Sequence, residues 1–227
     1  MSIRKLVKKL GLLSLAKILL MPVFKARAME HPTFGNDIHD LIIDENDYHR
    51  YVAISLAIKR IQAENIAGSI AEVGVYQGRT SKIIRRLAPE KPYYLFDTFE
   101  GFPQQDLETD KPDNRFDGTS VDLVMKNIGT SKNIIIKQGY VPDTFEGMDD
   151  EQYSFVLLDL DLYNPTLASL EYFYPRMAVG GYIMIHDYNS PESDWACMRS
   201  VDKFMADKPE QIIEVADICG SAMFRKI

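Results

Sequence analysis

Short apolar runs alternate with amphipathic stretches over most of the chain. Runs rich in branched and aromatic residues predict strands over 69–75, 92–97, 132–137, 153–160 and 180–187. Apolar positions at helical spacing predict helices over 79–88, 119–128, 165–174 and 195–207. The end of the chain predicts two strands, 211–216 and 221–226, joined near Gly220. Upstream, Asn46 or Asp47 can cap a helix that runs to about Glu64, after an irregular polar segment over 29–45.

This order predicts an α/β fold with a mostly parallel seven-stranded sheet, helices on both faces and an antiparallel last strand. In such sheets ligands bind where the carboxyl ends of the strands part. One segment, residues 98–118, is long, polar and rich in turn residues. Because it follows the second strand, we expect it to be a binding loop over the ligand cleft.

The first 28 residues differ from the rest in charge. They contain seven Lys or Arg and no acid, which leaves 19 basic against 33 acidic residues in the remainder. The apolar stretch from Leu10 to Leu20 contains Lys17 and is too short to span a bilayer. We predict a basic amphipathic helix over 1–28 that packs on another subunit or, through residues 1–21, rests on an anionic membrane surface; packing is the favoured alternative. Residues 29–66 and 67–227 then form two further segments of the chain.

Composition narrows the class of protein further. At 227 residues and 46% hydrophobic, the chain can form one α/β domain with a sizeable core. The acidic body argues against nucleic acid as a partner, because phosphate contacts need clustered cations. Two cysteines are too few for a disulfide framework, which favours a reducing, cytoplasmic location, with the inner membrane face as the peripheral alternative.

A cofactor motif lies between the first predicted strand and helix, where residues 71–81 read AEVGVYQGRTS. Glycines at 74 and 78 would let the backbone pass close to a ligand, and the helix start at Thr80 and Ser81 offers unpaired N–H groups. Asp97, which ends the next strand, suits the two hydroxyls of a ribose. The spacing lacks the GxGxxG arrangement for a pyrophosphate, so S-adenosylmethionine fits better than NAD or FAD. Glu72 could then hold the methionine amino group; the alternative is that Glu72 and Asp97 are ordinary helix-cap acids.

Acidic residues also mark two later strand ends. Asp159 and Asp161 flank Leu160 at the end of a very apolar strand, and His186 and Asp187 end the next one. Within a regular strand Asp159 and Asp161 would point to the same side, whereas beyond the strand end they could diverge. Carboxylates this close repel one another unless a cation compensates, and Mg²⁺ prefers hard oxygen ligands. His186 could share the ion, act as a base, or be a structural histidine, and one imidazole would also suit Mn²⁺ or Fe²⁺. The alternative for the acids is solvated caps or ion pairs with Arg176 or Lys203.

These stretches resemble the macrocin O-methyltransferase (TylF-type) family of sugar O-methyltransferases. The similar segments are AEVGVYQGRTS at 71–81, YLFDTFEGFP at 94–103, the run from Leu157 to Tyr188 and VDKFMADKP at 201–209. The resemblance implies a class I methyltransferase fold, S-adenosylmethionine, Mg²⁺ and methyl transfer to a sugar hydroxyl. It also implies a homo-oligomer in which an N-terminal segment, residues 29–66, completes the site or the dimer. Residues 67–227 are then the S-adenosylmethionine-binding methyltransferase domain. In this chain His186-Asp187-Tyr188 stands where the antibiotic-tailoring members have Asp-Asp-Tyr.

The resemblance assigns roles by position. Asp159 and Asp187 become metal ligands and Asp161 the general base; His186, where the chain departs from the family, is our own candidate for a third ligand or a base. The cofactor positions are Glu72, Gly74, Gly78, Ser81, Asp97 and Thr98, and we add Tyr76 and Thr80 from the same loop and helix start. The substrate would be a sugar on a glycan, a nucleotide sugar or a glycosylated natural product. The alternatives are a metal-dependent hydroxylase or other oxidoreductase on the same fold, and a non-catalytic scaffold that binds S-adenosylmethionine. Tyr188 and Trp195 either contact the sugar face or simply pack.

Overall fold

The computed structural model describes residues 36–43, 45–107 and 113–227. The predicted basic helix over 1–28 lies outside these residues. The chain divides into two compact units, residues 1–45 and 46–227. In the first unit, helix α3 (Asn36–Ile42) forms within a segment predicted to be irregular. Ile38, Leu41 and Ile42 lie at helical spacing in that stretch, so it has one apolar face that the polar composition concealed.

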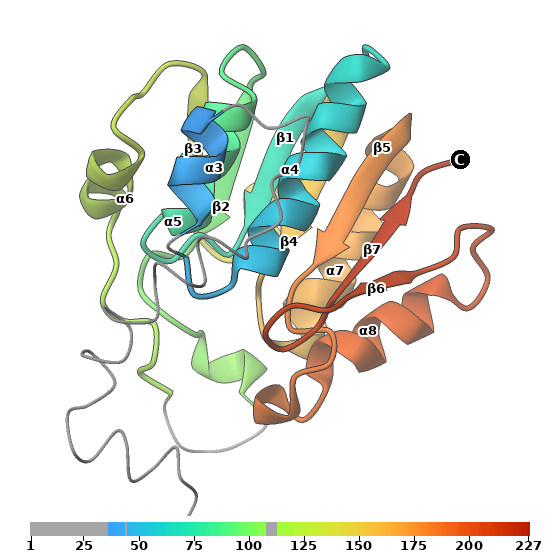
Figure 1. Ribbon diagram of the computed structural model, residues 1–227. Helices are drawn as coiled ribbons and strands as arrows, with labels where there is room; N and C mark the ends of the chain where they lie inside the picture. The colour runs from blue at the N-terminus through green and yellow to red at the C-terminus, as the bar shows by residue number, and fades with distance from the viewer. Residues whose placement is uncertain (1–35, 44, 108–112) are drawn as a thin grey trace, which may run out of the picture. The chain divides into compact units, whose positions relative to one another are not determined.

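The second unit is built on one seven-stranded sheet with the order β3-β2-β1-β4-β5-β7-β6 (Figure 1). The strands are β1 (Ser69–Val73), β2 (Tyr93–Asp97), β3 (Ile134–Gln138), β4 (Tyr153–Leu158), β5 (Met177–Ile185), β6 (Ile213–Val215) and β7 (Ser221–Arg225). Neighbours from β3 to β5 pair in parallel, and β7 pairs antiparallel with both β5 and β6. The predicted fold class and the antiparallel closing hairpin are confirmed.

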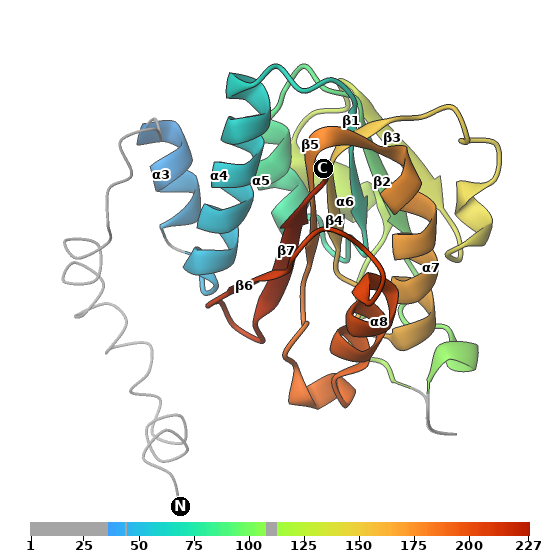
Figure 2. The same cartoon turned by 90° about the vertical axis from the view of Figure 1, so that its right-hand side faces the viewer.

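Helices cover both faces of the sheet, as Figure 2 shows. On one face α4 packs against α5, and α5 against α6; on the other face α7 packs against α8. Their bounds are α4 (Tyr48–Ala63), α5 (Arg79–Leu87), α6 (Val121–Ile128), α7 (Tyr163–Phe173) and α8 (Ala196–Met205). Strand order reverses between β1 and β4, so the carboxyl ends of these two neighbours face a common crevice.

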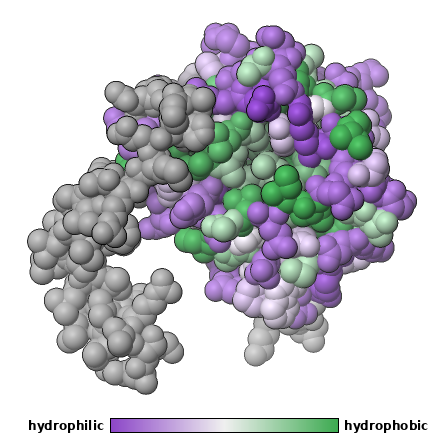
Figure 3. All heavy atoms as spheres, turned by 45° about the vertical axis from the view of Figure 1, so that its right-hand side comes forward, coloured by the Kyte–Doolittle hydropathy of each residue, from purple (hydrophilic) through white to green (hydrophobic). Residues whose placement is uncertain are grey.

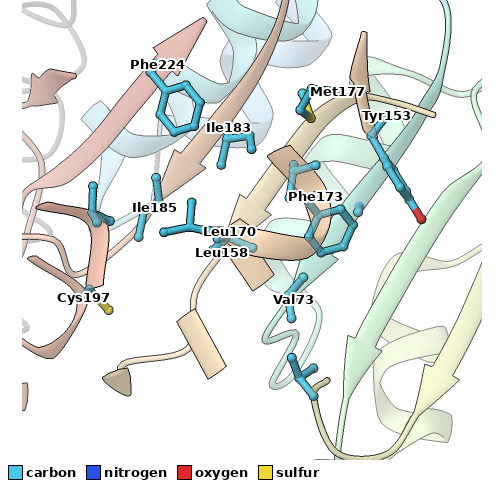
Figure 4. Close-up of a cluster of buried hydrophobic side chains, with 14 of the residues drawn as sticks. Val73, Tyr153, Leu158, Leu170, Phe173, Met177, Ile183, Ile185, Cys197 and Phe224 are labelled. Atoms are coloured by element: carbon cyan, nitrogen blue, oxygen red, sulfur yellow. The ribbon is translucent and has the colours of Figure 1, made fainter. Parts of the chain in front are cut away.

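The core on the α7–α8 face is closely packed and apolar (Figure 4). All six residues of β4 are buried, because this central strand has a helix layer on each side. Phe173 at the end of α7 contacts four other rings edge-on, with centroid distances of 4.9 Å to Tyr153, 5.0 Å to Tyr172, 5.2 Å to Phe145 and 5.8 Å to Phe96. This rigid centre fixes where the ends of β4 and β5 lie.

Two strand limits differ from the predicted ones in ways that affect the site. β4 ends at Leu158, so Asp159 and Asp161 belong to the turn after the strand and do not share one face of it. β5 begins three residues earlier than predicted, at Met177, because Gly180 and Gly181 do not start the strand but lie within it, at a bulge in the pairing with β4. A Cβ at Gly181 would lie 2.7 Å from the carbonyl oxygen of Ser154, so a side chain there would break this pairing.

On the face seen in Figure 3, hydrophobic residues gather within a surround of hydrophilic ones. Large exposed apolar side chains occur on β5, on β6 and after β6, at Val179, Ile213 and Ile218. None of the helices in the described ranges is long and apolar enough to cross a bilayer. The homo-oligomer stays a prediction.

A buried carboxylate anchors the end of the chain. Glu210 accepts hydrogen bonds from Tyr174 (2.7 Å), from the Lys226 ammonium (2.7 Å) and from the Ile227 amide (3.2 Å). Burial alone would raise the pKa of Glu210, but these donors outweigh it and hold the pKa at about 2. The ionised carboxylate therefore stabilises the fold fully at pH values above the ordinary pKa of glutamate, and this contribution is lost as the pH falls toward 2.

We expect Glu210→Gln to lower the free energy of unfolding by about 3 kcal/mol at pH 7, with the difference from wild type shrinking between about pH 4.5 and pH 2. Urea unfolding across pH 2–7 measures this difference. Asp150→Asn, at an exposed acid before β4, is the control. A wild-type minus Glu210→Gln difference that stays constant over this range would contradict the assignment.

Candidate active site

A pocket of about 530 Å³ lies at the carboxyl ends of β1, β2, β4 and β5. The β1–α5 loop, the segment after β2, the turn after β4, the end of β5 and the first turn of α4 contribute to its wall. Gly101, Phe102 and Phe116 also line it, and they belong to the segment predicted to be a binding loop. The pocket therefore lies at the edge of the sheet where ligands were expected.

The glycines of the β1–α5 loop are required by the chain itself. Gly74 has φ +87°, and a Cβ there would lie 1.9 Å from the carbonyl oxygen of Asp159. Gly78 has φ +73°, and a Cβ there would lie 2.9 Å from the Val124 side chain. We expected these glycines to make room for a cofactor; the close approach is instead to the turn after β4 and to α6. Gly74 also lines the pocket, and its small size lets the end of β1 lie against the turn that holds the acids.

Asp97 organises the loop between β1 and α5. Its Oδ2 accepts hydrogen bonds from the amides of Val75 (2.6 Å) and Tyr76 (2.9 Å), and its Oδ1 accepts from the Phe99 amide (2.7 Å). A carboxylate has about four acceptor positions, so one stays available toward the pocket. Thr98 lines the pocket, but its hydroxyl bonds to the Gly101 carbonyl at 2.9 Å.

Glu72 is buried at the pocket floor. It accepts a hydrogen bond from Ser81 Oγ at 2.7 Å and another from the Tyr93 hydroxyl. Burial raises the pKa of Glu72 to about 8, although both hydrogen bonds lower it. Ser81 therefore binds Glu72 rather than pointing to the pocket, and among the predicted cofactor positions only Gly78 and Ser81 do not line it.

The acids at the ends of β4 and β5 converge on one histidine. His186 Nδ1 lies 3.0 Å from Asp159 Oδ1 and 2.7 Å from Asp187 Oδ2. Asp161 and Asp187 have φ values of +60° and +55°, a left-handed conformation in which aspartate is tolerated better than most residues. These two turns aim carboxylates back toward the end of the sheet, at some cost in backbone strain.

Two residues of this cluster were not predicted from the sequence. Arg50 Nη1 lies 3.1 Å from Asp159 Oδ2 and Arg50 Nε lies 3.4 Å from Asp47 Oδ2. Asp47, a candidate N-cap, makes no side-chain cap bond and turns its carboxylate toward His186. A signal was present, because Asp47 and Arg50 continue the helical stripe of Ile54, Ile58 and Ile61, and charged residues on a buried stripe often indicate a site.

The charges in this cluster shift one another strongly. Burial would raise the pKa of Asp159, but His186 and Arg50 outweigh it and hold the pKa at about 2. Burial raises the pKa of Asp161 to about 8, and the Asp187 and Asp159 carboxylates add to this effect. For His186 the carboxylates of Asp159, Asp187 and Asp47 overcome the effect of burial and raise the pKa well above its usual range.

This donor set fits a divalent cation. Oxygen from Asp159, nitrogen from His186 and oxygen from Asp187 lie within 4.8 Å of one another. Two hard oxygens and one imidazole on one wall of an open pocket would hold three positions of Mg²⁺ or Mn²⁺ and leave others for water or substrate.

The two aromatic residues considered for sugar contact lie outside the pocket lining. Tyr188 is buried and its hydroxyl donates to Asp202 at 2.8 Å, so it packs. Trp195 is 42% exposed, and its indole N–H donates to Asn189 at 3.3 Å.

The fold and the pocket define a class I methyltransferase. Among solved structures, the O-methyltransferase NovP matches with a TM-score of 0.68 at 21% identity, covering 94% of this chain and 98% of that one. CalS11, described as a calicheamicin methyltransferase, matches with a TM-score of 0.66 at 17% identity, covering 92% of each chain.

The chain belongs to the macrocin-O-methyltransferase (TylF) family, whose model matches residues 46–226. It is 24% identical to the 8-demethyl-8-(2,3-dimethoxy-alpha-L-rhamnosyl)-tetracenomycin-C 4'-O-methyltransferase of Streptomyces olivaceus, covering 60% of this chain and 58% of that protein. It is also 24% identical to the mycinamicin III 3''-O-methyltransferase of Micromonospora griseorubida, covering 62% and 61%. The match therefore spans about three fifths of the length of these relatives. The family expected from the sequence is confirmed.

The contact between Gly74 and the turn after β4 generates a test. We expect Gly74→Ala to lower the free energy of unfolding by about 2–5 kcal/mol, because the left-handed conformation and the clash with the Asp159 carbonyl add. Gly129→Ala is the matched control, since Gly129 has φ +78° but nothing within 4 Å of its Cβ position. Chemical denaturation of both variants measures the difference. Equal losses in the two would show that the close approach is unimportant.

Proposed function

We propose that this protein is an S-adenosylmethionine-dependent and divalent-cation-dependent O-methyltransferase that methylates a sugar hydroxyl. The observation that carries the proposal is the convergence of Asp159, His186 and Asp187 beside Asp161, in the same pocket as the β1–α5 loop. With a cation at the first three residues and Asp161 as the base, both would lie in the same pocket as the donor, which supports the proposal.

The donor would occupy the part of the pocket formed by the ends of β1 and β2. S-adenosylmethionine supplies there an electrophilic methyl group on a sulfonium. Asp97 keeps one acceptor position for a ribose hydroxyl, and Glu72 lies at the floor, where a methionine amino group would find a carboxyl partner. Tyr76, Thr80 and Thr98 line the same region, while Gly78 and Ser81 act indirectly by shaping the loop and holding Glu72.

The cation would be held by Asp159, His186 and Asp187. Bound there, it would supply Lewis acidity that lowers the pKa of a coordinated hydroxyl. Arg50 binds one oxygen of Asp159, so the other oxygen, Oδ1, is the one directed at the cation site. The left-handed turn at Asp187 sets the direction of its carboxylate. These residues orient the acceptor sugar and hold it against the donor.

Asp161 is the proposed general base. Asp161 would accept the hydroxyl proton as the sugar oxygen takes the methyl group from the sulfonium of S-adenosylmethionine, whose carbon–sulfur bond would break to leave a neutral thioether. Burial and the neighbouring carboxylates of Asp187 and Asp159 raise the pKa of Asp161. The positive charge of a cation held beside it would lower that pKa again and leave Asp161 ionised to accept the proton. His186 is the other candidate base. Carboxylates lie beside both of its ring nitrogens, and we assign it to the cation.

The relatives support a sugar as the acceptor. Two of them are named for methylating rhamnosyl-tetracenomycin and mycinamicin III, and the solved CalS11 is described as a TDP-rhamnose 3'-O-methyltransferase. We therefore propose a deoxysugar or related sugar on a small molecule, a nucleotide or a glycan as the substrate class.

The direct test is methyl transfer from labelled S-adenosylmethionine to a panel of nucleotide sugars and glycosides, with and without chelator. We expect transfer that EDTA abolishes and Mg²⁺ or Mn²⁺ restores. Calorimetry with S-adenosylmethionine tests the donor site separately. Cofactor binding without any transfer would favour the scaffold, and oxygen consumption with Fe²⁺ would favour the hydroxylase.

Loss of Asp159 is expected to remove cation and activity together. In Asp159→Ala we expect no measurable Mn²⁺ binding by calorimetry and at least a hundredfold lower methyl transfer, because a charged ligand and the partner of Arg50 are both gone. S-adenosylmethionine affinity should change much less. Near-normal turnover of Asp159→Ala in the presence of chelator would show that the cation role is wrong.

Replacing Asp161 tests the role of the base without removing a proposed cation ligand. Asn also tolerates the left-handed conformation found at this position, so Asp161→Asn removes the base without forcing the backbone. We expect kcat to fall about 10²- to 10⁴-fold, with S-adenosylmethionine and Mn²⁺ affinities within about threefold of wild type. Asp194→Asn, at another left-handed aspartate that lies outside the pocket lining, is the matched control. A kcat within threefold of wild type would exclude Asp161 as the base.

A further inference from the structure

His186 presents its second ring nitrogen to an acid on another element. Nδ1 faces Asp159 and Asp187, and on the opposite side of the ring Nε2 lies 3.6 Å from Asp47 Oδ2. Nε2 is buried and forms no hydrogen bond within the described part of the chain. A buried imidazole N–H without an acceptor costs free energy, so a nearby carboxylate that can accept from it would stabilise the site.

Asp47 is held in place from the other side. Its Oδ1 accepts a hydrogen bond from the Ile218 amide at 3.1 Å, which ties the start of α4 to the turn between β6 and β7. Its Oδ2 lies 3.4 Å from Arg50 Nε, a second buried nitrogen that lacks a hydrogen bond among the described residues. Two buried nitrogens therefore face one carboxylate oxygen, each a few tenths of an ångström beyond ordinary hydrogen-bond distance.

Among the described residues, the Asp47 carboxylate has no partner besides the Ile218 amide, Arg50 and His186. It makes no cap bond to α4, so the helix does not explain why an acid stands here. The other acid grouped with His186 and Asp47 is Asp217, whose two oxygens accept hydrogen bonds from the amide and the hydroxyl of Ser221, both at 2.6 Å. Of these two acids, Asp47 is the one paired with Nε2, at 3.6 Å.

We propose that Asp47 is a positioning residue that keeps the proton of His186 on Nε2 and leaves Nδ1 free to bind the divalent cation. The inference rests on the proposed cation site. Metal-binding histidines commonly give their second N–H to a carboxylate, which fixes the tautomer and the orientation of the ring. An aspartate at position 186 would have no such second nitrogen, so this requirement is created by the histidine of this chain.

The test is a double-mutant cycle on the full chain, with Mn²⁺ affinity as the readout. We expect Asp47→Asn to weaken Mn²⁺ binding about 10- to 100-fold in calorimetry. In a His186→Gln background the same substitution should change the affinity less than threefold, because the path through Nε2 is absent. Asn at 47 can still accept from the Ile218 amide, so the start of α4 should stay in place.

Asp122→Asn is the control for lost negative charge, because Asp122 lies exposed in the first turn of α6. It should leave Mn²⁺ affinity unchanged. If Asp47→Asn costs the same in the wild-type and His186→Gln backgrounds, Asp47 acts by long-range attraction and the inference is overturned. If the wild-type chain binds no Mn²⁺, the proposed cation site fails and this inference falls with it; a wild-type chain that binds Mn²⁺ without coupling between 47 and 186 refutes only the inference.

A spectroscopic readout tests the tautomer directly. The chain has four histidines, so long-range ¹H–¹⁵N correlation spectra can be assigned with the His186→Gln variant. With Mg²⁺ added, we expect wild-type His186 to show a protonated Nε2 and an unprotonated Nδ1, and Asp47→Asn to show a mixture of tautomers. The same single tautomer in both proteins would overturn the assignment even if the variant binds less metal.

Discussion

The arrangement of the site depends on the packing of several carboxylates into one buried place. Asp159 and Asp187 offer oxygens within 4.8 Å of His186, and Asp161 and Asp47 lie beside them. At such a distance two like charges repel by about 3–4 kcal/mol for an effective dielectric constant near 20. Arg50 and His186 supply the compensating positive charge in the absence of a cation. The cluster is therefore best understood as a site that the fold holds together against its own repulsion.

The fold provides that restraint through its most rigid part. β4 and β5 are central, apolar and buried, and the acids follow them immediately, so their backbone positions are fixed before their charges interact. The left-handed turns at Asp161 and Asp187 persist because neighbouring strands and Gly74 leave the chain little alternative. The elements that complete the pocket, the first turn of α4 and the segment after β2, come from outside this centre. The proposed catalytic residues thus follow the rigid central strands, whereas the parts of the pocket that can vary with the substrate are the outer loop and helix start.

Much of the fold could be predicted from the sequence because its signals are local. The apolar run of β4, the alternation of strands and helices and the closing hairpin all appear within short windows. The early start of β5 could not be seen, since Gly180 and Gly181 look like the first residues of the strand until the pairing with β4 places them in a bulge. For the same reason Gly74 was expected to serve a ligand, whereas its neighbour is a carbonyl 85 residues further along the chain.

For the site, the sequence could identify acids that end strands but not the partners that reach them from elsewhere. Asp159, Asp187 and His186 lie together because adjacent parallel strands end at the same edge. Arg50 and Asp47 reach the same place only because α4 crosses the sheet near β4 and β5, a tertiary fact that no local pattern contains. Similarly, Ser81 looked like a helix-start hydroxyl open to a ligand, and its bond to the buried Glu72 follows from the packing of α5 on β1.

The histidine at position 186 changes what its surroundings must provide. A carboxylate ligand needs only a positively charged neighbour on the side away from the cation. An imidazole has a second ring nitrogen there, and the N–H at that nitrogen needs an acceptor. In this chain the far side of His186 meets the start of α4 and the turn between β6 and β7, which Asp47 joins through the Ile218 amide. In the proposed cation site, a histidine in place of a carboxylate at one strand end thus extends the set of residues that matter to a helix terminus and a hairpin. Variation of this position within the same fold should therefore be read together with residue 47, since the two side chains face one another across a buried gap.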